Sequence, residues 1–311
     1  MVCSFGLRAV YHATNYSCNR REGRRAVGRV GIVTDSTACL PPELASRYGI
    51  EVIPVFLVFR DQTYQDGVTA QAAEFYDMLR AAPEPPTTAA PSPGVYAEAM
   101  LRAGERSHAV VCITVSRQFS AMYDAAIQGA ALARERQPSL DIRVLDSTAA
   151  AMAQGFVALE AARAAGEGCA IDEVVARAEA LMPRVQLLVA LDTLTYLGRS
   201  GRVPRVIVWA SSPLQVKPIV VFQRGAYRPI AIVRTMRRAV DRLFQALEQR
   251  AEPGALHVCV HHTNVPEQAE ALAERVRTSL APKELHTVEF TQVMGVHTGP
   301  GLLGFACYNE A

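Results

Sequence analysis

Short apolar segments alternate with helix-like segments from residue 30 onward, and this alternation is the main structural signal in the sequence. Ala109–Val115 contains no charged residue, which is typical of a strand that is covered on both faces. We predict strands also at Val30–Asp35 and Ile142–Asp146. The strand at Ala109–Val115 is followed by a predicted amphipathic helix with apolar positions at Tyr123, Ile127, Ala130 and Ala131.

Acidic and hydroxyl-bearing residues follow these three strands, at Asp35–Ser36, Ser116–Ser120 and Asp146–Ser147. In an open parallel sheet, ligands bind outside the carboxyl ends of the strands, where helix amino termini offer unpaired N–H groups. The pattern therefore predicts a doubly wound parallel sheet with an anion site near Ser116 and Ser120. The alternative is that Ser120 only caps the helix that follows it.

Two proline-containing segments lie between the first strands. Val52–Val58 reads as a further strand, and Pro54 favours an edge position for it. Five prolines within Pro83–Gly94 predict a stiff loop without helix or strand, which would hold Thr88 and Ser92 in fixed positions. Ser92 is also placed to cap the helix that begins at Pro93.

The pattern changes from Val185, where strands dominate. A hairpin turn is predicted at Gln223–Ala226. Six strands are expected at 186–191, 216–222, 227–233, 256–260, 285–290 and 302–308, and two helices near 235–250 and 265–279. The sequence thus predicts an α/β protein with a Rossmann-like domain over 30–165, built on a parallel doubly wound sheet, and a mixed-sheet domain over 166–311.

Two glycine-containing segments in the second domain carry candidate functional side chains. Leu194–Val203 is predicted to be a tight turn with two arginines, of which Arg202 is the second. Such arginines are usually solvated or paired with a surface carboxylate. The glycines near His297, including Gly299, would let the backbone approach a ligand closely, although a turn histidine is ordinarily just exposed.

Composition narrows the functional classes. Half of the 311 residues are hydrophobic and the formal net charge is +2, which argues against a nucleic-acid surface. No apolar run reaches about 18 residues, so we expect no stable membrane insertion. Residues 1–29 lack the apolar core of a signal peptide and end in clustered arginines. We interpret them as a disordered basic extension or as upstream sequence read through from a mis-chosen start codon.

Cysteine and histidine spacing gives no sign of a metal or a disulfide framework. The seven cysteines are scattered without a C-x-x-C pair, which fits free thiols in a reducing cytoplasm. His261 and His262 are adjacent on a predicted strand, so their side chains point to opposite faces and cannot share an ion. We expect no cofactor.

Several spaced motifs together resemble the DegV family, fatty-acid-binding proteins that serve as the lipid-carrying subunit of bacterial fatty-acid kinase. The resemblance extends from about residue 30 to the end of the chain. It rests on Thr34–Thr37 with Leu40–Pro41, Asp66–Gly67 with Phe75–Tyr76, Thr88 with Pro91–Gly94, Ser116–Tyr123, Asp146–Ser147, Leu197 with Gly201–Val203, Lys217–Ile219 and His297–Gly301.

The resemblance implies two α/β domains that enclose one long-chain fatty acid, with the carboxylate between the domains and the tail in the second domain. It assigns carboxylate binding to Thr88, Ser120 and His297. It assigns contact with the kinase catalytic subunit to Arg202, and an acyltransferase of phospholipid metabolism is a further candidate partner. Loop support is expected from Asp35, Ser36, Ser92, Ser116 and Gly299.

Some positions depart from the family pattern. The family usually has Ser and Gln where this chain has Ala89 and Ala90, and Gly where it has Ala121. It also has Ser and Gly near Ala151 and Ala153. The missing glycine at position 121 slightly narrows the approach of a ligand to the helix, whereas the residues assigned to the carboxylate are all present.

Two functional hypotheses follow. The first is a non-catalytic carrier that presents its fatty acid to an ATP-dependent kinase, and the second is a serine acyl hydrolase that uses Ser120, His297 and Asp35 or Asp146. No G-x-S-x-G elbow and no G-x-x-x-x-G-K-[ST] loop occurs in the sequence, which favours the carrier. The apolar strands of the second domain could line a tunnel or simply fill a close-packed core.

Overall fold

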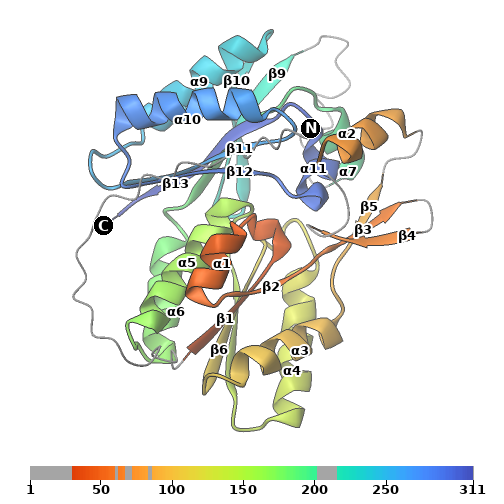
Figure 1. Cartoon of the computed structure of the whole chain (residues 1–311), viewed down its shortest axis with the longest axis vertical. Coiled ribbons are helices and arrows are strands. Elements are labelled where there is room, and N and C mark those ends of the chain that lie inside the picture. The colour runs from red at the N-terminus through yellow and green to blue at the C-terminus, as the bar shows by residue number, and fades with distance from the viewer. Residues whose placement is uncertain (1–29, 60–61, 67–71, 83–85, 202–215, 311) are drawn as a thin grey trace, which may run out of the picture.

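The computed structural model describes residues 30–59, 62–66, 72–82, 86–201 and 216–310. The predicted extension at 1–29 and the candidate partner residue Arg202 lie outside the described residues. Figure 1 shows two large sheets, one in each half of the molecule, with helices around both.

The first sheet is fully parallel, with the strand order β2-β1-β6-β7. Its strands are β1 (Val30–Asp35), β2 (Glu51–Ile53), β6 (Ala109–Thr114) and β7 (Asp141–Asp146). The associated helices are α1 (Pro42–Tyr48), α3 (Pro93–Gly104), α4 (Met122–Arg136), α5 (Met152–Gly166) and α6 (Ile171–Leu181). Because α3 and α4 lie on one face and α1, α5 and α6 on the other (Figure 1), the predicted doubly wound parallel sheet is confirmed.

The buried face of α4 differs from the one that the sequence predicted. Ile127 is 45% exposed and Ala131 is exposed, so neither belongs to the core. Of the four predicted positions only Ala130 is fully buried, and the other buried positions of α4 are Met122, Ala126, Gly129 and Ala133. Gly129 explains the choice, because a Cβ there would lie 2.7 Å from the carbonyl oxygen of Pro93. The small residues let α4 approach α3 closely, and this packing overrides the larger side chain of Ile127.

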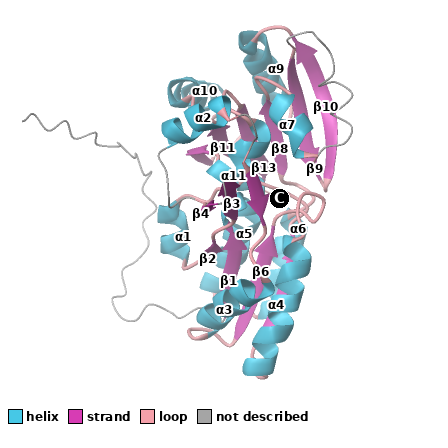
Figure 2. Ribbon diagram, turned by 90° about the vertical axis from the view of Figure 1, so that its right-hand side faces the viewer, coloured by secondary structure: helices cyan, strands magenta, loops and turns pink. Residues whose placement is uncertain are grey.

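The second sheet has six strands in the order β10-β9-β8-β13-β11-β12. Only β11 and β12 pair in parallel, which confirms the predicted mixed sheet. The strands are β8 (Gln186–Ala190), β9 (Lys217–Gln223), β10 (Ala226–Val233), β11 (Leu256–His262), β12 (Glu284–Glu289) and β13 (Leu303–Asn309). Helices α9 (Met236–Glu248) and α10 (Pro266–Leu280) cover one face (Figures 1 and 2). The predicted hairpin between β9 and β10 turns at Arg224 and Gly225, both with positive φ.

Helix α5 joins the two sheets into one core. It packs against β1 and β6 of the first sheet and against β8 and β13 of the second. Nearly all of its residues are buried, including Gln154, as expected of a helix that is surrounded by protein. Its first turn is tied to the second sheet, since the backbone N–H of Met152 donates to Nε2 of His261 over 3.2 Å.

A small third sheet corrects two predictions. Its antiparallel strands are β3 (Phe56–Phe59), β4 (Gln62–Gln65) and β5 (Thr87–Ala89), in the order β4-β3-β5, and α2 (Ala72–Ala81) follows β4 in the chain. The single strand predicted at Val52–Val58 is wrong, because the chain leaves the parallel sheet at Pro54, which has no N–H for the ladder. The loop predicted around Thr88 is in fact strand β5, which pairs with β3 through backbone bonds that need no local sequence signal.

Candidate functional site

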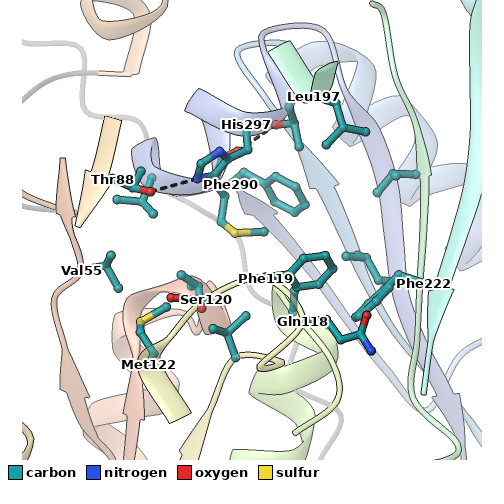
Figure 3. Close-up of a pocket in the computed structure, with 18 of the residues that line it drawn as sticks. Val55, Thr88, Gln118, Phe119, Ser120, Met122, Leu197, Phe222, Phe290 and His297 are labelled. Carbon is teal, nitrogen blue, oxygen red and sulfur yellow. Dashed lines mark hydrogen bonds between the residues drawn. The ribbon is translucent and has the colours of Figure 1, made fainter. Parts of the chain in front are cut away.

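A cavity of about 510 Å³ lies between the loops of the first sheet and the inner face of the second. Figure 3 shows its wall, to which the two halves of the chain contribute different side chains. The apolar part of the wall includes Leu187, Val189, Leu191, Val220, Phe222 and Phe290. Apart from Tyr227, the polar side chains on the wall are Thr37, Thr88, Gln118, Ser120, His297 and Thr298.

The apolar wall is set by the register of β8 and β9. Leu187 lies opposite Phe222 and Val189 opposite Val220, so these four side chains share one face and line the cavity. Their neighbours Leu188 and Val221 point the other way, into the core under α9 and α10. Because both faces are buried, the sequence shows a continuous apolar run with no alternation.

Three aromatic rings close one end of the cavity. The ring centroid of Phe119 lies 4.5 Å from that of Phe222 and 5.4 Å from that of Tyr227. Phe119 belongs to the loop after β6 and the other two to the β9–β10 hairpin, whose Gly225 N–H donates to the Thr148 carbonyl. Burial raises the pKa of Tyr227, so its phenol stays neutral at physiological pH.

The polar end contains a hydrogen bond between two residues that are 209 positions apart. Thr88 Oγ1 and His297 Nε2 are separated by 3.2 Å (Figure 3). Thr88 is placed by β5, where it lies opposite Leu57 of β3. His297 lies in the last turn of α11 (Gln292–Thr298), a helix where the sequence predicted a turn, and this helical placement aims the imidazole at the cavity.

Ser120 lines the same cavity, on the loop that leads into α4 (Figure 3). The alternative that Ser120 caps α4 is wrong, because Ala121 occupies the N-cap position and no side chain caps this helix. Within the described part of the chain the Ser120 hydroxyl has no protein partner. Thr88, Ser120 and His297 therefore line one cavity, as their assignment to one ligand requires.

Asp35 organises the loops beneath the polar end. Its carboxylate is fully buried and accepts bonds from the Thr37 and Val115 backbone N–H groups, both 3.0 Å, and from the Gln154 amide at 3.1 Å. Burial raises the pKa of Asp35, although these hydrogen bonds offset part of the effect. Asp35 is thus a structural acceptor for the short 3-10 helix Ser36–Ala38.

Three other predicted support residues shape loops near the cavity. Ser116 is buried, and its oxygens accept the N–H groups of Gln118 and Phe119, which forms the turn that carries Ser120. Ser36 donates to Asp66 over 2.6 Å. Gly299 has a φ of 74°, and a Cβ there would lie 2.1 Å from the Tyr196 ring, so only glycine fits.

Ser92 is not brought to the cavity. It is exposed at the N-cap position of α3, makes no side-chain capping bond and does not line the cavity wall.

The tight turn predicted at Leu194–Val203 is also corrected, because residues 195–200 form helix α7 (Thr195–Ser200) and Gly201 follows as its left-handed C-cap. Leu197 of this helix adds to the apolar wall.

The sequence reasoning missed Asp66 as a site residue. Asp66 is 4% exposed and accepts both the Ser36 hydroxyl and the Val293 backbone N–H. Burial raises the pKa of its carboxyl. Its only sequence signal was its presence in a family motif, because neither strand pattern nor spacing links residue 66 to residue 293.

Three of the groups that a serine hydrolase would use already make other hydrogen bonds. Nε2 of His297 bonds Thr88, Asp35 holds the loop contacts described above, and Asp146 accepts backbone N–H groups of Arg117 and Thr148.

Among the described residues no three His, Cys, Asp or Glu side chains gather as metal ligands. The helices in the described ranges include none with the length and apolar character needed to cross a membrane.

The structure is thus that of an α/β protein in which a parallel sheet and a mixed sheet enclose an apolar cavity with one polar end. The chain belongs to the DegV family, since the family model described as "Uncharacterised protein, DegV family" matches residues 29–310. A DegV domain-containing protein of Streptomyces coelicolor is 36% identical over 277 residues, which cover 88% of this chain and 96% of the relative.

Solved structures of the family have the same fold. A DegV family protein from Thermus thermophilus, described by its fatty acid binding, matches with a TM-score of 0.83 and 27% identity over 91% of this chain and all of that one. DegV from Bacillus subtilis, described as a fatty acid binding protein, gives a TM-score of 0.80 with 29% identity over 91% of this chain and 99% of that one. A stearic acid-binding protein from Eubacterium ventriosum gives 0.83 and 25%, over 90% and 98%.

Proposed function

We propose that this protein binds one long-chain fatty acid and presents its carboxylate to a separate ATP-dependent kinase subunit, which forms the acyl phosphate. The carboxylate is held by Thr88, Ser120 and His297, and the tail lies along the wall formed by β8 and β9. The observation that carries this proposal is the apolar cavity with its hydroxyl and imidazole groups gathered at one end.

The size and lining of the cavity suit a single acyl chain. Its volume of about 510 Å³ falls within the range of small-molecule sites. At about 0.8 kcal/mol per buried methylene, a chain of roughly sixteen carbons contributes on the order of 10 kcal/mol before the costs of ordering and association. The tail therefore supplies most of the affinity, and the polar end needs only to fix the orientation.

The polar end matches what a partly buried carboxylate requires. A carboxylate removed from water is costly unless it accepts hydrogen bonds, and bonds to an ionised acceptor are the strong ones. The Thr88 and Ser120 hydroxyls and the His297 imidazole can all donate such bonds. Because the Ser120 hydroxyl has no partner among the described residues, it can turn toward a ligand without breaking an existing bond.

The proposed carrier role leaves the chemistry to a partner. The sequence has no P-loop to bind ATP, so the phosphoryl transfer falls to the kinase catalytic subunit, and an acyltransferase is a candidate consumer of the product. From the family resemblance we assign Arg202 to contact with the kinase, and we place the protein in the cytoplasm. Replacing Arg202 by Ala should spare fatty-acid binding and lower acyl-phosphate formation in a reconstituted kinase assay.

Native mass spectrometry of the purified protein tests the proposal. We expect one co-purifying fatty acid per chain, released by denaturation and identified by its mass. The doubly changed protein Thr88→Val/His297→Gln should retain less of it, while Ser92→Ala, a hydroxyl loss outside the cavity, should match the unchanged protein. An empty cavity together with turnover of acyl esters would instead support the serine hydrolase.

A further inference from the structure

We propose that Asp66 is a positioning residue that assembles the polar end of the cavity, by holding the strand system of Thr88 and the helix of His297 with one carboxylate. The assignment rests on the proposed function, because it concerns recognition of the fatty-acid head group. Asp66 itself does not line the cavity wall, so it acts through other residues.

Asp66 closes a ring of hydrogen bonds at the start of β3. Its backbone N–H donates to the Val55 carbonyl over 2.9 Å, and the Val55 N–H donates to Ser36 Oγ over 3.1 Å. Ser36 Oγ in turn donates to Asp66 Oδ2 over 2.6 Å. This ring fixes the chain where it leaves the parallel sheet and begins β3. Since β5 pairs directly with β3, the ring also fixes the position of Thr88.

The other carboxylate oxygen holds α11. Asp66 Oδ1 accepts the backbone N–H of Val293 over 3.1 Å, in the first turn of the helix. That N–H has no partner within its own helix, and the residue at the N-cap position, Thr291, makes no side-chain capping bond. Asp66 therefore supplies the cap from a distant part of the chain, and its negative charge also suits the positive end of the helix.

The position of α11 determines where the imidazole of His297 lies. Val293 and His297 are four residues apart, so they are neighbours on one face of the helix. The helix is also confined at its middle, where a Cβ on Gly295 would lie 2.4 Å from the Tyr76 hydroxyl. A shift of the first turn cannot be absorbed by sliding the helix in this tight packing, so it reaches His297.

Asp66 thus links both partners of the 3.2 Å bond between Thr88 and His297. A carboxylate is needed because both oxygens must accept a bond. With asparagine at this position, Oδ1 can accept only one of the two bonds; if it keeps the Val293 N–H, the amide Nδ2 faces Ser36 Oγ as a donor, and the Ser36 O–H loses its charged acceptor. Asp66 is 4% exposed, so water cannot readily replace the lost bond.

The test compares a fatty acid with the primary alcohol of the same chain length, because the alcohol uses the apolar wall but has no carboxylate. The unchanged protein should bind the acid more tightly. In Asp66→Asn the dissociation constant of the acid should rise about tenfold, the loss of roughly one charge-assisted hydrogen bond, while that of the alcohol stays within about twofold. Ser36→Ala, which removes one link of the ring, should act in the same direction with a smaller effect.

Glu284→Gln provides the matched control. Glu284 is a partly buried carboxylate with several partners, Arg163, His257 and His286, but it lies on β12 and does not line the cavity. This variant should lower the melting temperature without changing the ratio of acid to alcohol affinity. Should Asp66→Asn fail to fold, Ser36→Ala decides the question by the same ratio.

An unchanged acid-to-alcohol ratio in the Asp66 variant, or in Ser36→Ala if that is the folded one, would overturn the positioning role and leave Asp66 as a stabilising residue only. The unchanged protein reports separately on the proposed function. If it showed no preference for the acid, the carboxylate site itself would be refuted, and the role of Asp66 with it.

Discussion

The two faces of the cavity are built in different ways. The face from the second sheet consists of alternate residues of β8 and β9, and its apolar character follows from strand register alone. The face from the first half of the chain consists of loops and the short strand β5, which bring Thr37, Thr88 and Ser120 to the cavity. The apolar face can supply affinity without much directionality, and the loop face can supply direction with few contacts.

The two faces also differ in how they are stabilised. The apolar face rests on a six-stranded ladder, so a single substitution disturbs it only locally. The polar end depends on single contacts between distant segments, such as Thr88 with His297 and Asp66 with Val293. We therefore expect changes of the tail to alter affinity strongly, and changes of the polar end to alter selectivity more than affinity.

The largest effect should come from the ligand tail. Removing four methylenes from the best-bound acid should cost about 3 kcal/mol, or roughly 200-fold in affinity, because each buried methylene contributes about 0.8 kcal/mol. Isothermal titration of the delipidated protein with a series of saturated acids measures this directly. An affinity that does not depend on chain length would place the tail outside the apolar wall.

Bound lipid should stabilise the fold by a similar amount. A ligand that binds only the folded protein adds about 2.7 kcal/mol to the free energy of unfolding at a hundredfold excess over its dissociation constant. Melting curves of the delipidated protein with added acids of different length should show a shift that rises and then falls with length. The absence of a shift with every acid would refute lipid binding in the cavity.

The free energy of unfolding should depend on pH through the contact between α5 and the second sheet. Burial lowers the pKa of His261 from 6.5 to about 3, so the folded state favours the neutral ring that accepts the Met152 N–H. Its contribution is fully present above about pH 6.5 and is lost as the pH falls, by about 2 kcal/mol at about pH 5. Burial also lowers the pKa of His262, which acts in the same direction.

The buried carboxyls Asp35 and Asp66 act in the opposite direction, because their raised pKa values stabilise the fold as the pH falls. The informative quantity is therefore the difference between the unchanged protein and His261→Gln in urea titrations between about pH 7 and pH 5. We expect the variant to have the flatter pH dependence. Parallel curves would show that His261 does not titrate across the junction.

The smallest effect should come from one hydroxyl at the polar end. Thr88→Val keeps the shape of the side chain and removes one hydrogen bond, so the acid should bind about fivefold more weakly, equivalent to about 1 kcal/mol. Thr298→Val is the matched control, because the Thr298 hydroxyl also lies at the cavity but donates to the Met294 carbonyl within its own helix. Equal losses in the two variants would mean that Thr88 has no special contact with the carboxylate.

The apolar face could largely be predicted from the sequence. The strands β8 and β9, the hairpin from β9 to β10 and the two covering helices lie within a residue or two of the predicted ranges, since hydrophobic runs and glycine turns are local signals. The parallel sheet was also predictable from local signals. Each of its three longer strands is followed by an acidic or hydroxyl-rich loop.

The polar end was less predictable because its structure depends on contacts between distant segments. Strand β5 is defined by its pairing with Phe56, Leu57 and Val58 of β3, whereas its proline-rich surroundings predict a loop. Helix α11 has seven residues and takes its cap from Asp66, so no local capping signal marks it. The family resemblance predicted that Thr88, Ser120 and His297 share one site, and all three line one cavity, whereas the elements that bring them there, β5 and α11, required the fold.

Carbon NMR of a fatty acid labelled at its carboxyl group reports directly on the surroundings of the bound carboxylate. With the delipidated protein we expect one narrow bound resonance that saturates at one acid per chain. Thr88→Val should shift this resonance, while Phe222→Leu, at the aromatic end of the cavity, should leave it in place. No bound resonance, or a resonance that moves with Phe222→Leu and not with Thr88→Val, would contradict a carboxylate held at Thr88, Ser120 and His297.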